Sequence, residues 1–322
     1  MPWHRGSVYS LIRKYCAKPL RQAENAMDRG AAGAIPRKAM STAQRKMVPR
    51  EHGAYAELLF PIVTVFLGGR PTASTWLLAG GAVACFLANE PLLVLFGQRG
   101  SRTKRVDSDR ARRALLFLML VALGTGVAGL VLAPTVVRYS VGVPLMLGAG
   151  LVMLAAQGLE RSVLGETLAA ATLSSVAIPL GLSARLHMPE TLAVALIWLV
   201  VSLLGTALVR LTVARAKAKT EGDVAHVRLK RTVLVLVALI VLAIGVAAPL
   251  GARVGLWVFG AAVPMALAVL AMAALRPTAR RLRLVGWTLV AANLCSLIAV
   301  VTTLKIIQDF SAVEPTLPFP MF

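Results

Sequence analysis

A short run near residue 50 carries charged groups of both signs and an imidazole into an apolar segment: Arg50-Glu51-His52-Gly53-Ala54-Tyr55-Ala56-Glu57. Arg50 and Glu57 share one face at helical spacing. An acid at the centre of a membrane helix costs about 2.5–3.5 kcal/mol on insertion scales, so the deeper Glu57 is predicted to bind a ligand. Arg50 and Glu51 fit either ligand binding or an interfacial anchor with an internal ion pair. His52 is the histidine that lies near these candidates.

A second group of polar residues, Asn89-Glu90-Pro91, lies inside an apolar segment. Proline removes a helix hydrogen bond and disfavours helical geometry just before it. A kink there would leave backbone carbonyls beside the Glu90 carboxylate and the Asn89 amide. This pattern predicts a site for a cation or a polar head group. The alternative is a carboxylate buried against an arginine of another helix, for stability alone.

Basic residues follow two of the apolar segments and could bind an anion. Arg99 lies in a basic loop after the second segment, and Arg210 lies nearest the membrane in a basic stretch after the sixth. Arginine suits bidentate phosphate contacts, so two such loops on one membrane face predict an anion-binding lid. The alternative is that these charges set topology and attract anionic lipids. Glu166 could line the same cavity or be solvated at the inner surface.

The composition indicates what must position these groups. Of 322 residues, 57% are hydrophobic and 15% charged, whereas soluble domains have roughly 45–50% apolar and about 25% charged residues. A net charge of +21 could indicate nucleic-acid binding. Here Lys and Arg lie in short loops between apolar spans, which is a topological pattern, so no nucleic-acid partner is expected. The three cysteines show no CxxC spacing, so we expect neither a disulfide framework nor a zinc site.

Nine segments are apolar enough, or nearly so, to cross a bilayer, which needs roughly 20 apolar residues in helical form. They are Gly53–Gly69, Ser74–Phe96, Ala114–Ala133, Val141–Gln157, Val163–Leu182, Thr191–Val209, Thr232–Leu250, Val254–Leu275 and Leu284–Leu304. With the N-terminus inside and sides alternating, 30 of the 35 Lys and Arg lie inside. The sequence therefore predicts an all-α, polytopic membrane helical bundle, N-in and C-out, in the inner (plasma) membrane.

Three regions are expected along the chain. Residues 1–47 form a basic cytoplasmic extension, either disordered, as from a mis-assigned start, or containing an interfacial helix on anionic lipid. Residues 48–310 form the nine-helix transmembrane domain, and residues 311–322 a short tail outside the cell. Membrane lipids are the expected surroundings of the middle region.

The first two segments resemble a known family. The run Val48-Pro49-Arg50-Glu51-His52-Gly53-Ala54-Tyr55, then Leu58-Leu59-Phe60-Pro61, is similar to the opening signature of the YwiC-like bacterial membrane proteins. Asn89-Glu90-Pro91-Leu92-Leu93 and Gly97-Gln98-Arg99-Gly100 also resemble that family, and the resemblance is specific over Val48–Arg113. It implies a membrane protein of a family without an established biochemical activity.

The span pattern is more distantly similar to that of UbiA-type intramembrane prenyltransferases, which have nine helices with the N-terminus inside. Their two Asp-rich motifs bind Mg²⁺ and an isoprenoid diphosphate. This likeness implies a UbiA-like arrangement, with Glu90 as a metal ligand and Mg²⁺ as a cofactor. The counterpart of the second motif, Arg210–Lys219, has no acid before Glu221. Two-metal chemistry is therefore not expected, although arginines could neutralise a phosphate directly.

Three functions remain open from the sequence. The first is the handling of a lipid or isoprenoid phosphate, by a divergent transferase or a non-catalytic relative, in an inner-leaflet cavity lined by Arg50, Glu57, Asn89, Glu90 and Arg210. The second is an accessory or assembly role, with the charged clusters docking a protein partner. The third is ion- or proton-coupled transport, which intramembrane acids and a proline-broken helix also suit. The sequence leaves open whether the protein is an enzyme.

Overall fold

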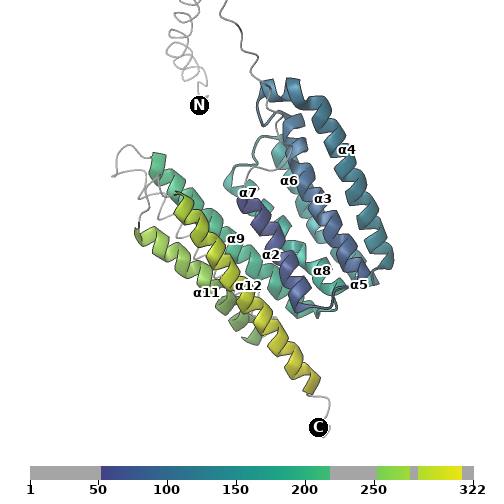
Figure 1. Ribbon diagram of the computed structural model, residues 1–322, viewed down its shortest axis with the longest axis vertical. Helices are drawn as coiled ribbons and strands as arrows, with labels where there is room; N and C mark the ends of the chain where they lie inside the picture. Colours follow the sequence, from purple (N-terminus) through teal and green to yellow (C-terminus); the bar gives the residue numbers. More distant parts are fainter. Residues whose placement is uncertain (1–51, 218–251, 276–281, 314–322) are drawn as a thin grey trace, which may run out of the picture. The chain divides into compact units, whose positions relative to one another are not determined.

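The computed structural model describes residues 52–217, 252–275 and 282–313, all within the unit Met47–Phe322. Every element in these three ranges is an α-helix (Figure 1). The helices are α2 (His52–Gly68), α3 (Ala73–Phe96), α4 (Ser101–Leu132), α5 (Thr135–Ser140), α6 (Gly142–Ala156), α7 (Val163–Ser175), α8 (Ala177–Ser183), α9 (Met188–Lys217), α11 (Ala252–Leu275) and α12 (Leu282–Val313). The predicted head 1–47, seventh span Thr232–Leu250 and most of the predicted tail lie outside these ranges.

The hydropathy map agrees with the helices wherever the two can be compared. Each of the eight predicted spans within the described ranges coincides with one helix or with two consecutive helices. Six of these stretches are long and apolar enough to cross a membrane, and Tyr55–Gly68 and Gly260–Met272 are shorter apolar helices. The chain is therefore a multi-pass, all-helical membrane protein over the part described. The total of nine spans and the N-in orientation remain predictions.

The fifth predicted span is divided into two helices, α7 and α8, at Val176. The cause lies three residues further on, because Pro179 has no N–H to donate to the Ser175 carbonyl, and its ring crowds that carbonyl. The sequence analysis did not predict this break.

Helices α3 and α4 form a tight antiparallel hairpin through small residues. A Cβ atom on Gly129 would come within 2.9 Å of the Leu78 side chain, and one on Gly81 within 3.3 Å of Thr125 Oγ1. The Ser74 hydroxyl donates a hydrogen bond of 2.9 Å to the Gly129 carbonyl. Small residues and short polar side chains let membrane helices approach closely, which explains how the backbones of α3 and α4 come together.

Helix α9 lies at the centre of the described helices, in contact with α2, α7, α8, α11 and α12. Its Trp198 is 1% exposed and stacks on Phe60 of α2, with ring centroids 5.1 Å apart. The Trp198 indole N–H donates to Thr64 Oγ1 at 2.9 Å, so the buried polar atom of this large aromatic residue has a hydrogen-bond partner.

Side-chain and backbone hydrogen bonds gather the loops at two opposite ends. At one end the Arg70 N–H donates to the Ala184 carbonyl at 2.8 Å, joining loop 69–72 to the end of α8. At the other, the Gln98 amide donates to the Ala155 carbonyl at 3.0 Å, joining loop 97–100 to the end of α6. We call these the Arg70 end and the Arg99 end.

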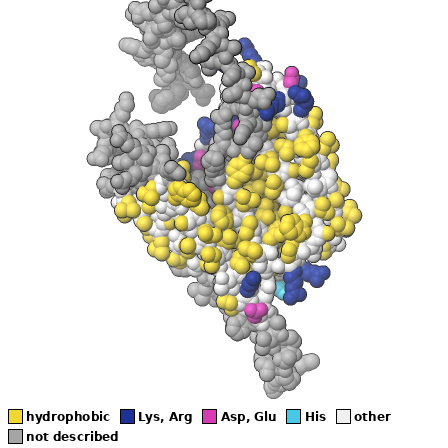
Figure 2. Space-filling view, viewed as in Figure 1, with side chains coloured by type: hydrophobic (Ala, Val, Ile, Leu, Met, Phe, Trp, Pro, Cys, Tyr) yellow, Lys and Arg dark blue, Asp and Glu magenta, His cyan; other side chains and the backbone are white. Residues whose placement is uncertain are grey.

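The grouping of the loops at two ends agrees with the sequence analysis, in which successive loops alternate between the two sides of the membrane. Figure 2 shows hydrophobic side chains over the middle of one face and charged side chains gathered toward its two ends. An apolar belt between two charged rims is the pattern expected for helices that cross a bilayer. Which end faces the cytoplasm remains a prediction.

Candidate polar site

The buried carboxylate of Glu90 is paired with Arg99, nine positions later in the chain. Glu90 is 3% exposed on α3. The helix continues through Pro91 and ends at Gly97, whose positive φ of 80° lets the chain turn back. The Arg99 Nε then donates to Glu90 Oε1 at 3.0 Å and its Nη2 donates to Oε2. This bidentate pair resembles the structural alternative considered for Glu90, except that the arginine comes from the following loop rather than another helix.

An unpartnered hydroxyl lies near this pair. The Tyr55 hydroxyl is buried, and within the described ranges it has no hydrogen-bond partner. The ring of Tyr55 on α2 meets Phe86 of α3 edge-on, at 5.2 Å between centroids. Phe86 lies about one helical turn before Glu90 on α3, so the Tyr55 ring packs beside the turn that carries Glu90. Buried hydroxyls normally have a partner, so Tyr55 is a candidate donor to a ligand. The sequence analysis did not propose Tyr55 as a site residue.

A second ion pair joins α7 to α9. The Arg210 Nε donates to Glu166 Oε2, and Arg210 Nη2 donates to the Arg161 carbonyl at 3.0 Å. The two charged side chains are about one-third exposed, so water screens this pair more than the Glu90 pair. The structure therefore brings Arg210 and Glu166 together, and anchors the loop before α7 to the end of α9.

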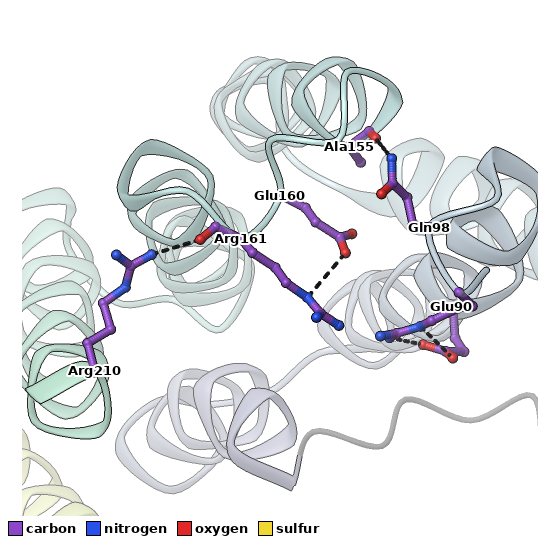
Figure 3. A network of polar contacts seen from close by, with 7 residues as sticks. Glu90, Gln98, Ala155, Glu160, Arg161 and Arg210 are labelled. Carbon is purple, nitrogen blue, oxygen red and sulfur yellow. Dashed lines mark hydrogen bonds and ion pairs between the residues drawn. The ribbon is translucent and has the colours of Figure 1, made fainter. Parts of the chain in front are cut away.

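The loop before α7 adds two charged residues that the sequence analysis did not propose as site residues. The Arg161 Nε lies 3.7 Å from Glu160 Oε1, and the Arg161 side chain is 72% exposed. In Figure 3 this side chain extends away from Arg210, in the direction of the Glu90 pair. In the sequence analysis Arg161 was only one of the Lys and Arg residues counted on the inside. An adjacent acid and base between two apolar spans was the signal that could have identified it.

We call the six residues at the Arg99 end the polar cluster: Glu90, Arg99, Glu160, Arg161, Glu166 and Arg210. They come from α3, the loop after it, the loop before α7, and helices α7 and α9. Three acids and three arginines balance in formal charge. The arrangement can donate several hydrogen bonds to an anion, but it offers no excess of positive charge.

The other predicted site residues are not members of the polar cluster. Asn89 is exposed, although its neighbour Glu90 is buried. Glu57 is partly buried on α2. His52 begins α2, and the structure describes its backbone only. Arg50 and Glu51 precede the described ranges. Their proposed role in binding therefore remains a prediction.

The polar cluster does not fit a magnesium ion at Glu90. Both Glu90 oxygens already accept hydrogen bonds from Arg99. Within residues 52–217, 252–275 and 282–313, no group of three or more His, Cys, Asp or Glu side chains could hold a metal. Mg²⁺ prefers several oxygen ligands in octahedral geometry, and this arrangement does not offer them.

Comparison with known proteins confirms the resemblance for part of the chain. A family model described as YwiC-like protein matches residues 48–180, which include α2 to α7 and the start of α8. No curated protein and no solved structure matches the chain. The likeness to UbiA-type prenyltransferases remains a prediction.

Proposed function

We propose that this YwiC-like membrane protein binds a phosphorylated lipid at the polar cluster, from the cytoplasmic leaflet of the plasma membrane. The proposal includes the predicted N-in, C-out orientation, which makes the Arg99 end cytoplasmic. It is a proposal of binding, without prenyl transfer, because the residues present do not fit the metal that such transfer uses.

The proposal is supported by the exposure of Arg161 and its weak pairing with Glu160. Arg99 and Arg210 are held closely by Glu90 and Glu166. Arg161 is mostly exposed, and its distance to Glu160 is 3.7 Å, longer than a hydrogen bond. A phosphate that approached this guanidinium would gain short charge-assisted bonds, while Glu160 would lose little. Arg161 is thus the arginine of the cluster best placed to exchange its partner for a ligand.

The charge balance of the polar cluster favours a ligand with few negative charges. Three arginines face three acids, so a diphosphate would bring more negative charge than the site could neutralise without a metal. A phosphate monoester or diester is the better match. Because the cluster lies at the end of apolar helices, the rest of such a ligand would lie among hydrocarbon, which favours a lipid over a soluble phosphate.

Binding of dodecyl phosphate by the full-length protein in phosphatidylcholine nanodiscs tests the proposal. We expect Arg161→Ala to weaken binding tenfold or more, since a hydrogen bond to a charged group contributes about 1.5–3 kcal/mol and about 1.4 kcal/mol corresponds to tenfold. Arg70→Ala, an exposed arginine at the opposite end, is the matched control and should bind as the unmodified protein does.

Equal binding by the Arg161→Ala and Arg70→Ala variants and the unmodified protein would contradict the proposal. A protein that co-purifies in fixed ratio and shields Arg161 from chemical modification would favour the accessory function instead.

A further inference from the structure

A cavity of about 270 Å³ lies among α6, α7, α8 and α9. It adjoins the break between α7 and α8, with Ser174 and Ile178 on the two sides of that break, and Ala171, Ala195 and Leu199 among its other lining residues. None of the described residues that line it is charged. The Ser174 hydroxyl has no partner in the described part of the chain, but it is buried and presents almost no surface, so the wall that an occupant meets is apolar.

The cavity and the polar cluster are built on the same two helices. Along α7, Ser174 follows Glu166 by eight residues, or roughly 12 Å at 1.5 Å per residue. Along α9, Leu199 precedes Arg210 by eleven residues, or roughly 16 Å. The hydrocarbon core of a bilayer is about 30 Å thick, so the cavity lies near its middle. This is the depth at which the chain of a lipid anchored in one leaflet ends.

We infer that the cavity holds the far end of the hydrocarbon chain of the lipid whose phosphate binds at the polar cluster. This inference rests on the proposed function. At about 30 Å³ for each water-sized unit, the cavity accommodates roughly nine such units, which is enough for the terminal carbons of one hydrocarbon chain. The cavity is open on one side, so a chain end can enter it and gain dispersion contacts with the apolar wall.

The inference makes binding depend on chain length as well as on the phosphate. A hexyl phosphate would end above the cavity, whereas a hexadecyl phosphate would reach it. The long chain should therefore bind more tightly, and the difference should disappear when a larger side chain fills the cavity.

The experiment uses full-length protein in phosphatidylcholine nanodiscs and a hexadecyl phosphate with a photoreactive diazirine at its chain end. Peptide mass spectrometry then locates the crosslink, which we expect within residues 171–178 or 192–199. Ala195→Phe, which fills the cavity, should reduce this crosslink at least fivefold. Ala292→Phe on α12 replaces a similarly buried alanine outside the cavity and is the matched control. If Ala195→Phe does not fold, Ala171→Leu replaces it in the same wall.

The outcomes separate the inference from the function on which it rests. If alkyl phosphates bind through Arg161 but the chain end crosslinks elsewhere and Ala195→Phe changes nothing, the cavity inference fails and the proposed function stands. If the phosphate-free hexadecanol analogue labels the cavity equally well, the occupant is bulk lipid and the inference is overturned. If no alkyl phosphate binds, the proposed function fails, and the inference fails with it.

Discussion

The guanidinium of Arg99 meets both carboxylate oxygens of Glu90, although the two residues lie on either side of a helix end. The side chains are 13% and 4% exposed, so the pair is largely removed from water. Such a pair is well formed only while both partners are present, because either charge alone would be buried without compensation.

Glu90→Gln should therefore destabilise the protein strongly. Loss of one partner of a buried pair costs about 3–5 kcal/mol. Thermal unfolding in detergent measures the effect. Glu160→Gln changes a longer ion pair of 3.7 Å whose arginine is mostly exposed, and should cost less than Glu90→Gln. The double variant Glu90→Gln/Arg99→Gln should recover part of the lost stability, and a double variant less stable than Glu90→Gln alone would contradict this account.

Thr64→Val should leave the Trp198 indole N–H without its acceptor. The donor is fully buried, and an unsatisfied buried group costs about 1–3 kcal/mol. Denaturant unfolding of the purified protein measures this loss. Thr167→Val is the control, because the exposed Thr167 hydroxyl donates to a carbonyl of its own helix. Similar losses from both substitutions would show that the hydrogen bond to Trp198 is unimportant.

Gly181→Ala should overpack the contact between α8 and α9, because the added Cβ would lie 1.9 Å from Thr191 Cγ2. Overpacking costs typically about 1–3 kcal/mol. Thr191→Ser removes the clashing methyl group and should restore stability in the double variant, as seen in the unfolding midpoint. Gly124→Ala in α4 meets nothing within 4 Å and should be neutral or stabilising by up to about 1 kcal/mol.

Single cysteines should be labelled from opposite sides of the membrane at the two ends. Ser101 is exposed at the Arg99 end, and Tyr139 is 81% exposed at the other. In a cysteine-free background, Tyr139→Cys should react with an impermeant maleimide in intact cells, and Ser101→Cys only after permeabilisation. Labelling of both from one side would contradict the grouping of the loops, and the reverse pattern would invert the proposed orientation.

Hydropathy located the helices because the bilayer imposes a length on every apolar span. The second, sixth and ninth predicted spans agree closely with α3, α9 and α12 in position, although α9 and α12 extend past the predicted ends. The division of the fifth span was missed, because the effect of Pro179 on the Ser175 carbonyl is local and leaves mean hydropathy unchanged.

The candidate site was less predictable, because its pairings join distant segments. The sequence identified Glu90 as an acid inside the second span, and Arg99, Glu166 and Arg210 as charges near span ends. It could not indicate that Arg210 pairs with Glu166, 44 positions away, since that depends on how α7 packs on α9. It also gave Asn89 and Glu90 one shared role, whereas adjacent residues of a helix point about 100° apart and here differ in exposure.

The α3–α4 hairpin has arms of unequal length. With Leu78 beside Gly129 and Gly81 beside Thr125, the end of α3 at Phe96 comes roughly level with Arg110, since both helices rise equally per residue. Figure 1 shows the first turns of α4 passing across the end of the hairpin before the helix runs beside α3. Insertions or deletions in this overhang, before Arg110, would leave the pairing unchanged. One residue removed further along would rotate every later side chain of α4 by about 100° and bring the wrong face against α3.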